Sequence, residues 1–167
     1  MAIEVRPVRE GEHEETGRVT ALAYREFVRP GDHDWEEYLQ HIADVEGRAR
    51  STEVLVAVQD GDILGSATVE LDGRIDDDDP PLHPEEAHIR MLGVHPDARG
   101  RGIARSLIDA CLQVAREAGR TYVTLHTTQR MKAAQAMYDA LGFERLEDRV
   151  FPDGFVLLTY RRSIPPA

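Results

Sequence analysis

The segment "GVHPDARGRGIARSLIDACLQVAREAG", Gly93 to Gly119, constrains the fold more than any other part of the chain. An apolar run ends, a short loop follows with Gly100 and Gly102, and an amphipathic helix begins directly after it. Apolar residues three or four positions apart predict one buried helix face. They are Ile103, Leu107, Ile108, Cys111, Val114, Ala115 and Ala118. Gly119 is typical of the glycine that follows the last turn of a helix.

The elements around this segment indicate an α/β fold. Strands are predicted over residues 87–94 and 121–127, and a strand, a crossover helix and a second strand of this length predict parallel pairing. The pattern also predicts strands over 3–9 and 155–161, two strands around the Asp60-Gly61 turn within 54–71, and helices over about 12–28, from about 34, and over about 132–141. In the helix from about 34, four residues at helical spacing are expected to face the core: Trp35, Tyr38, Leu39 and Ile42.

Composition limits the class of protein. With 167 residues, 41% of them hydrophobic, the chain is expected to form a single domain over 1–167 with its core at about 3–161. A formal net charge of -11 disfavours nucleic acid as a partner. No signal peptide or membrane span is visible, so we expect a cytoplasmic protein with no membrane partner. The single cysteine, Cys111, cannot form an intramolecular disulfide, and its place on the apolar helix face favours a buried structural thiol over a nucleophile.

An acidic stretch, "DGRIDDDDPPLHPEE" at 72–86, is predicted to be a loop. Solvation of the acidic run is the simpler interpretation, and a site that attracts cations is the alternative.

The glycine loop is a candidate anion site. The first amide groups of a helix have no intrahelical partner and lie at the positive end of its dipole. Gly100 and Gly102 let a ligand approach the backbone closely, and Arg99 and Arg101 add charge suited to phosphate. A tight strand-to-helix turn with no ligand also fits. A dinucleotide fingerprint does not, because the third glycine of that motif is missing.

Two motifs resemble the GCN5-related N-acetyltransferase (GNAT) family. "RGRGIA", Arg99 to Ala104, matches the family's Arg/Gln-x-x-Gly-x-Gly/Ala signature at its usual place, after the fourth strand and at the start of the third helix. "AAQAMYDALGF", Ala133 to Phe143, resembles the family's closing segment. The resemblance extends over roughly residues 3–161. It implies a single-domain mixed β-sheet flanked by helices, with a splay between the fourth and fifth strands.

The resemblance also implies acetyl-CoA as co-substrate, with no metal. Its pyrophosphate would lie on the loop residues Arg99, Gly100, Arg101, Gly102, Ile103 and Ala104. Its pantetheine arm would pair like an extra strand with Leu92, Gly93 and Val94. Many members carry asparagine seven residues before the motif tyrosine, where this chain has Met131.

Three residues are candidate catalytic groups. Tyr138 resembles the family's general acid, although its spacing with Ala134 and Leu141 also suits a core tyrosine. Relatives often place a glutamate that acts as general base on the fourth or fifth strand, at positions that correspond to His88 and His126. A neutral imidazole can accept a proton near pH 7, and His88 is favoured over His126 for this role. Both histidines also suit a structural role in a sheet. Glu70 is the alternative base, and the histidines lack the spacing of metal ligands.

The function indicated is N-acetyltransfer, in which a primary amine attacks the thioester of acetyl-CoA directly. The acceptor would be a small-molecule or peptide amine, and the family resemblance makes a homodimer possible. The alternative is a catalytically silent acyl-CoA-binding or sensing domain, which needs the anion loop but neither an acid nor a base.

Overall fold

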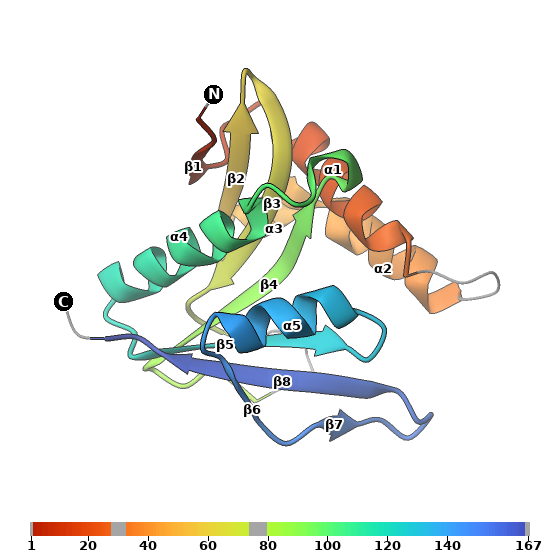
Figure 1. The fold of residues 1–167 in the computed structure, drawn as a ribbon, viewed down its shortest axis with the longest axis vertical. Helices are drawn as coiled ribbons and strands as arrows, with labels where there is room; N and C mark the ends of the chain where they lie inside the picture. The colour runs from red at the N-terminus through yellow and green to blue at the C-terminus, as the bar shows by residue number, and fades with distance from the viewer. Residues whose placement is uncertain (1, 28–32, 74–79, 166–167) are drawn as a thin grey trace. The chain divides into compact units, whose positions relative to one another are not determined.

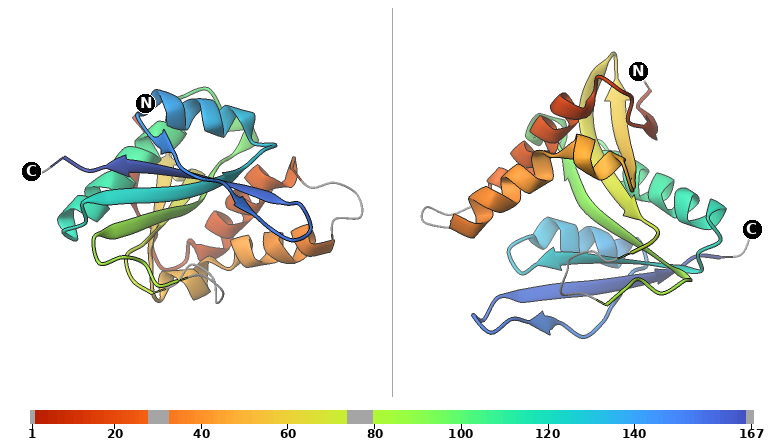
Figure 2. Two further views of the ribbon diagram at one scale, coloured as in Figure 1. Left: turned by 90° about the horizontal axis from the view of Figure 1, so that it is seen from below. Right: turned by 180° about the vertical axis from the view of Figure 1, so that it is seen from behind.

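The computed structural model describes residues 2–27, 33–73 and 80–165 of the chain. They form two compact units, one from Met1–Val69 and Met91–Cys111 and the other from Glu70–Arg90 and Leu112–Ala167. Figure 1 shows the elements by label and Figure 2 gives two further views. Each unit is built around β-strands, as predicted for an α/β chain. That the chain is one domain stays a prediction.

The first unit contains an antiparallel sheet of β1 (Glu4–Pro7), β2 (Glu53–Gln59) and β3 (Asp62–Glu70), followed in the strand order by β4 (Glu86–Val94). The turn between β2 and β3 confirms the predicted hairpin. Asp60 and Gly61 have φ values of 52° and 84°, and a two-residue turn with both φ values positive matches the twist of the strands it joins.

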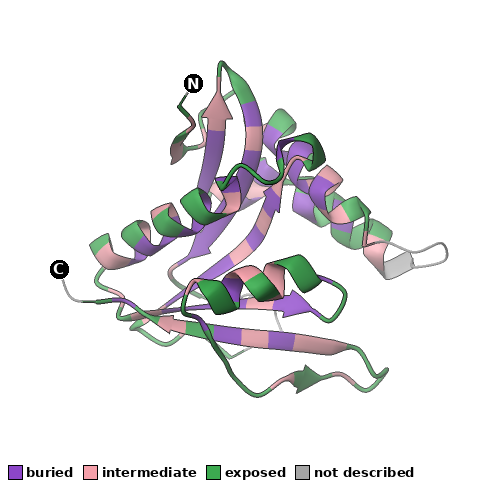
Figure 3. Cartoon of the chain, viewed as in Figure 1, coloured by how far each residue is buried: buried purple, intermediate pink, exposed green. Residues whose placement is uncertain are grey.

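Helices α1 (His13–Arg25), α2 (His33–Ala43) and α3 (Val45–Ala49) belong to the first unit, which also contains the first part of α4 (Ile103–Glu117). Leu39 and Ile42 of α2 are buried beside Met91, as predicted. Tyr38 was expected in the core, but 39% of it is exposed, because its ring lies along the helix surface against Trp35 with 5.5 Å between ring centroids. Figure 3 shows the buried residues along β2 and β3.

The helices of this region differ from the prediction in two places. The first helix ends at Arg25 rather than near 28, and its expected terminator at residues 30–31 lies outside the described residues. The short helix α3 was not predicted. It begins at Asp44, whose side chain accepts a hydrogen bond from the amide of Gly47 and so caps the helix.

The second unit contains the first part of β4, then β5 (Tyr122–Thr128), β8 (Val156–Ser163) and β6 (Glu144–Arg145), with β7 (Arg149–Val150) also paired to β8. β4 and β5 are parallel, as predicted, with Glu86–Ile89 in register with Tyr122–Leu125. The register ends there, while β4 runs on to Val94 and β5 to Thr128, as expected for strands that splay. β8 is antiparallel to β5.

Helix α4 (Ile103–Glu117) has the predicted buried face and the predicted end. Gly119 has a φ of 78°, and the amide of Arg120 donates to the carbonyl of Ala115 at 3.0 Å. This bond, from a residue beyond the glycine back into the helix, is the usual closure of a helix by a left-handed glycine. Helix α5 (Lys132–Ala140) is close to its predicted range. Of the predicted acidic loop at 72–86, residues 74–79 lie outside the described part of the chain. Residues 72, 73 and 80–85 form no helix or strand, as predicted, whereas Glu86 already belongs to β4.

Cys111 should be unreactive in the folded protein. The side chain is fully buried on the apolar face of α4, and burial raises the pKa of the thiol to about 12. Because the thiolate is the reactive form, Ellman's reagent at pH 8 should detect almost no thiol in the native chain and one thiol per chain in guanidinium. As this is the only cysteine, the assay needs no control variant. Rapid reaction of the native protein would contradict the buried structural role.

Candidate functional site

The glycine loop of the first unit has the geometry expected of an anion site. Gly100 and Gly102 have φ values of 80° and 77°, a region that favours glycine. A Cβ placed on either residue would meet no atom within 4 Å, so the space beside the loop is open. Helix α4 starts directly after it, and the amide of Ser106 makes an early helical bond to the carbonyl of Gly102 at 3.1 Å. The amides of the first turn therefore lie at an accessible positive helix end.

Two arginines flank this loop. Arg99 forms an ion pair with Glu26 and donates to the carbonyl of Ala23 at 3.4 Å. Arg101 donates to the side chain of Gln59 at 3.3 Å. Both arginines remain exposed, so their charge adds to the positive potential at the loop.

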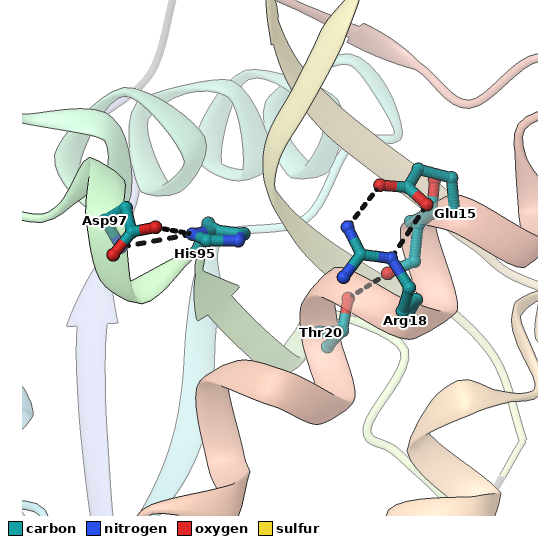
Figure 4. Close-up of polar contacts among 6 residues, drawn as sticks. Glu15, Arg18, Thr20, His95 and Asp97 are labelled. Atoms are coloured by element: carbon teal, nitrogen blue, oxygen red, sulfur yellow. Dashed lines mark hydrogen bonds and ion pairs between the residues drawn. The ribbon is translucent and has the colours of Figure 1, made fainter.

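A short 3-10 helix, η1 (Pro96–Ala98), leads into the loop from β4. His95 begins it, and its Nδ1 accepts a hydrogen bond from the amide of Asp97 at 3.1 Å. Figure 4 shows this pair and, nearby, the Glu15–Arg18 pair of α1. Between them lies a pocket of about 490 Å³, which Arg101 also lines. Arg18 holds the pKa of the Glu15 carboxyl below its usual range, so these two charges at the wall of the pocket are already paired.

The strand expected to hold a pantetheine arm ends in the first unit. Met91 has a φ of 53°, which is unusual for a non-glycine residue in a strand. This irregular backbone lies just before the expected residues Leu92, Gly93 and Val94. A Cβ on Gly93 would lie 3.0 Å from the Cβ of Ala23, so a glycine here lets α1 approach β4 closely.

The two candidate histidines lie together in the second unit. His88 is in register with Thr124, and His126 lies two residues further along β5, so all three side chains share one face of the strands. The imidazole rings of His88 and His126 have centroids 4.8 Å apart. His88 is 2% exposed, whereas His126 is half-buried.

Two residues that the sequence analysis did not single out complete this cluster. The Nδ1 of His88 lies 2.8 Å from the hydroxyl of Thr124, and that hydroxyl donates to Glu86 at 2.6 Å. Glu86 lies two residues before His88, on the same face of β4. The period of two would have placed these side chains together once the register of the parallel strands was known.

Tyr138 lies on the other face of the second unit. It is 5% exposed, and its ring packs against Phe143 and Tyr160, with centroids 5.8 and 5.5 Å away. Tyr160 is in register with Leu125, so its side chain points to the opposite face from His126. The structure thus brings the histidines together and places Tyr138 across the strands from them.

Two further positions bear on the chemistry. Glu70, the alternative base, is 8% exposed and accepts a hydrogen bond from Arg90 at 3.1 Å, so it is already engaged by a cation. Met131 is 9% exposed and begins α5, and its sulfur accepts a weak bond from the hydroxyl of Thr127 at 3.4 Å. A buried thioether does not replace the hydrogen bonds of the asparagine found in many relatives.

Comparison with known proteins identifies the family. The model described as "Acetyltransferase (GNAT) family" matches residues 17–143, which is well over half of the chain. The chain belongs to the GNAT acetyltransferase family. Both sequence motifs that suggested this membership lie within the matched residues.

Individual relatives agree with this assignment. Human N-acetyltransferase 8B is 34% identical over 79 residues, which are 47% of this chain and 35% of the human protein. The matched segment thus spans about a third of the length of the curated relatives. A GNAT-family acetyltransferase from Staphylococcus aureus Mu50 has 19% identity and a TM-score of 0.72, with 98% of this chain and all of that chain covered. YncA from Salmonella typhimurium, solved with its cofactor acetyl-CoA, has 18% identity and a TM-score of 0.71, with 100% and 96% covered.

These solved structures share the fold of this chain, so the predicted GNAT-like α/β architecture is confirmed. Within the described ranges, no group of three or more histidine, cysteine or acidic residues is arranged to hold a metal ion. No helix in the same ranges is long and apolar enough to cross a membrane.

Proposed function

We propose that this GNAT-family chain is an N-acetyltransferase that moves the acetyl group of acetyl-CoA to a primary amine. The observation that carries the proposal is the loop from Arg99 to Ala104. Its two glycines have positive φ and open space beside them, at the start of a 15-residue helix. The space beside the glycines is open to a ligand, and the amides at a helix start suit a pyrophosphate. Family membership and the acetyl-CoA bound to YncA support the same ligand.

The reaction forms a C–N bond and breaks a C–S bond: R–NH2 + CH3CO–S–CoA → R–NH–CO–CH3 + HS–CoA. The proton lost by the amine nitrogen needs an acceptor, and the thiolate leaving group needs a proton donor. In this proposal the imidazoles of His88 and His126 are the candidates for the acceptor, and the hydroxyl of Tyr138 supplies the donor. The end of β4, at Leu92 to Val94, binds the pantetheine amides through its backbone.

The acceptor class proposed is a cationic amine, either a small molecule or a peptide. A formal net charge of -11 supports this choice, because a negative protein attracts positively charged partners. A cytoplasmic location and a homodimer belong to the same proposal. They rest on the single cysteine and on the family resemblance respectively.

Release of free CoA separates an enzyme from a silent binding domain. With acetyl-CoA at pH 8, CoA release should rise above the buffer rate when spermidine, a lysine peptide or a peptide with a free N-terminus is added. Each CoA released should match one acetyl group on the acceptor by mass spectrometry. The N-acetylated form of each acceptor is the control, since its amine can no longer attack.

A different result would favour the alternative function. If acetyl-CoA binds by calorimetry but no amine in the panel raises CoA release, the silent acyl-CoA-binding or sensing domain becomes the better description.

A further inference from the structure

In the cluster formed by Glu86, His88, Thr124 and His126, the hydrogen bonds determine which ring nitrogen of His88 carries a proton. A hydroxyl has one proton, and Thr124 donates its proton to the carboxylate of Glu86 at 2.6 Å. The contact of 2.8 Å between Thr124 and the Nδ1 of His88 then requires His88 to be the donor. His88 therefore carries its proton on Nδ1, and its Nε2 holds the lone pair.

The surroundings of His88 also favour its neutral form. The ring is 2% exposed, and burial, followed by the nearby charges of His126 and Arg90, holds the pKa of His88 well below its usual range. Two imidazoles with centroids 4.8 Å apart do not readily both carry a positive charge. The half-buried His126 is the ring that can exchange protons with water.

Other charged groups surround the pair. Arg90 lies on β4 beside His88, paired with Glu70 at the end of β3. Arg161 of β8 is in register with Thr124, and its guanidinium lies over the ring of Tyr122 at 4.1 Å. Glu86 reaches His88 through the hydroxyl of Thr124.

From this arrangement we infer that Glu86 and Thr124 are positioning residues that hold His88 as a neutral Nδ1–H imidazole, and that His126 alone accepts the proton of the acceptor amine. The inference rests on the proposed function for the role of His126, but the state of His88 is a property of the ligand-free chain. In the step itself, the amine nitrogen loses one proton as the C–N bond forms, and the imidazole nitrogen of His126 gains it. The proton later leaves to water.

Nuclear magnetic resonance tests the state of His88 without any substrate. In the full chain labelled with 15N-histidine, between pH 5.5 and 8.5, His88 should show a protonated Nδ1, an unprotonated Nε2 and no titration. His126 provides the second signal of the pair for comparison. His88→Gln and His126→Gln assign the two signals among the seven histidines. Titration of His88 near pH 6.5, or a proton on its Nε2, would overturn the inference.

Variants of the positioning residues provide the matched comparison. Thr124→Val keeps the shape but removes the hydroxyl, so the Nδ1–H signature of His88 should be lost. Thr124→Ser keeps a hydroxyl and should retain it. Glu86→Gln should weaken the signature, because a neutral amide accepts a weaker bond than a carboxylate. An unchanged His88 signal in folded Thr124→Val would show that Thr124 does not hold this ring.

The pH profile tests His126 in the proposed reaction. For the wild type, kcat/KM should fall as pH drops through the range of about 6 to 7, since a protonated imidazole accepts no further proton. His126→Gln should lower kcat by roughly 10² to 10⁴ and remove the decrease of kcat/KM at low pH. Thr124→Val should lower kcat with little change in KM, and Thr124→Ser should restore it. If kcat/KM of His126→Gln still decreased at low pH as in the wild type, His126 would not be the proton acceptor.

The measurement of CoA release and the resonances of His88 test different claims. Absence of CoA release from the wild type with every amine would contradict the proposed function, whatever the resonances of His88 show. A titrating His88 in an active enzyme would contradict the positioning role alone.

Discussion

Gly102→Glu should abolish CoA binding while the chain still folds. The substitution places a carboxylate in the open space beside the loop, where a Cβ meets no atom within 4 Å. Like charges brought together cost several kcal/mol, and each 1.4 kcal/mol is a factor of ten in affinity, so calorimetry should show a loss on the order of 100-fold or more. The positive φ of 77° adds about 1 to 2 kcal/mol of backbone strain.

A matched control separates strain from the effect of charge in the loop. Gly119, at the other end of helix α4, has a φ of 78° and the same empty surroundings. Gly119→Glu carries equal strain and equal charge but lies outside the loop, so CoA affinity should stay near the wild-type value. Gly102→Ala adds strain without charge and should bind more tightly than Gly102→Glu. Unchanged CoA affinity in a folded Gly102→Glu variant would remove the basis for the anion site.

The parts of the fold that were predictable depend on local chemistry. The hairpin follows from Asp60-Gly61, because both residues tolerate the positive φ that the turn requires. The parallel pair follows from the length of the crossover through α4. By contrast, β6 and β7 have two residues each, and they are strands only because β8 lies beside them. Two residues are too few to show the alternation that identifies a strand in the sequence.

Other features depend on tertiary context. The positive φ of Met91 gives no signal in the sequence, since methionine does not favour that conformation. Tyr38 has the spacing of a core residue, yet it lies at the border of the buried face of its helix and is exposed. Periodicity predicts which side of a helix is apolar, but not how far the neighbouring elements extend over it.

The candidate site was predictable in part for a similar reason. A loop motif is contiguous, so Arg99 to Ala104 could be recognised directly and its glycines have the expected geometry. His88 and His126 were chosen one at a time, and their contact depends on the register that places His88 beside Thr124. The hydrogen bonds through Thr124 to Glu86 require side-chain positions, which no spacing rule supplies.

Tyr138→Phe should cause a large loss of turnover while the chain keeps its fold. The phenyl ring preserves the packing against Phe143 and Tyr160, so only the hydroxyl is lost. If that hydroxyl protonates the leaving thiolate, kcat should fall by roughly 10² to 10⁴, while the affinity for acetyl-CoA changes little. Steady-state kinetics measures the first quantity and calorimetry the second.

Tyr160→Phe is the control for this prediction, because it removes a hydroxyl from the same aromatic cluster. Tyr160 is 1% exposed, and burial raises the pKa of its hydroxyl, which disfavours the ionised form. Its loss should alter stability more than kcat. Both variants remove one hydroxyl from the same cluster, so an effect of packing alone would appear in both. A loss of turnover confined to Tyr138→Phe would therefore support an acid at that position. Wild-type turnover in Tyr138→Phe would show instead that Tyr138 is a core residue, and the thiolate would then take its proton from water.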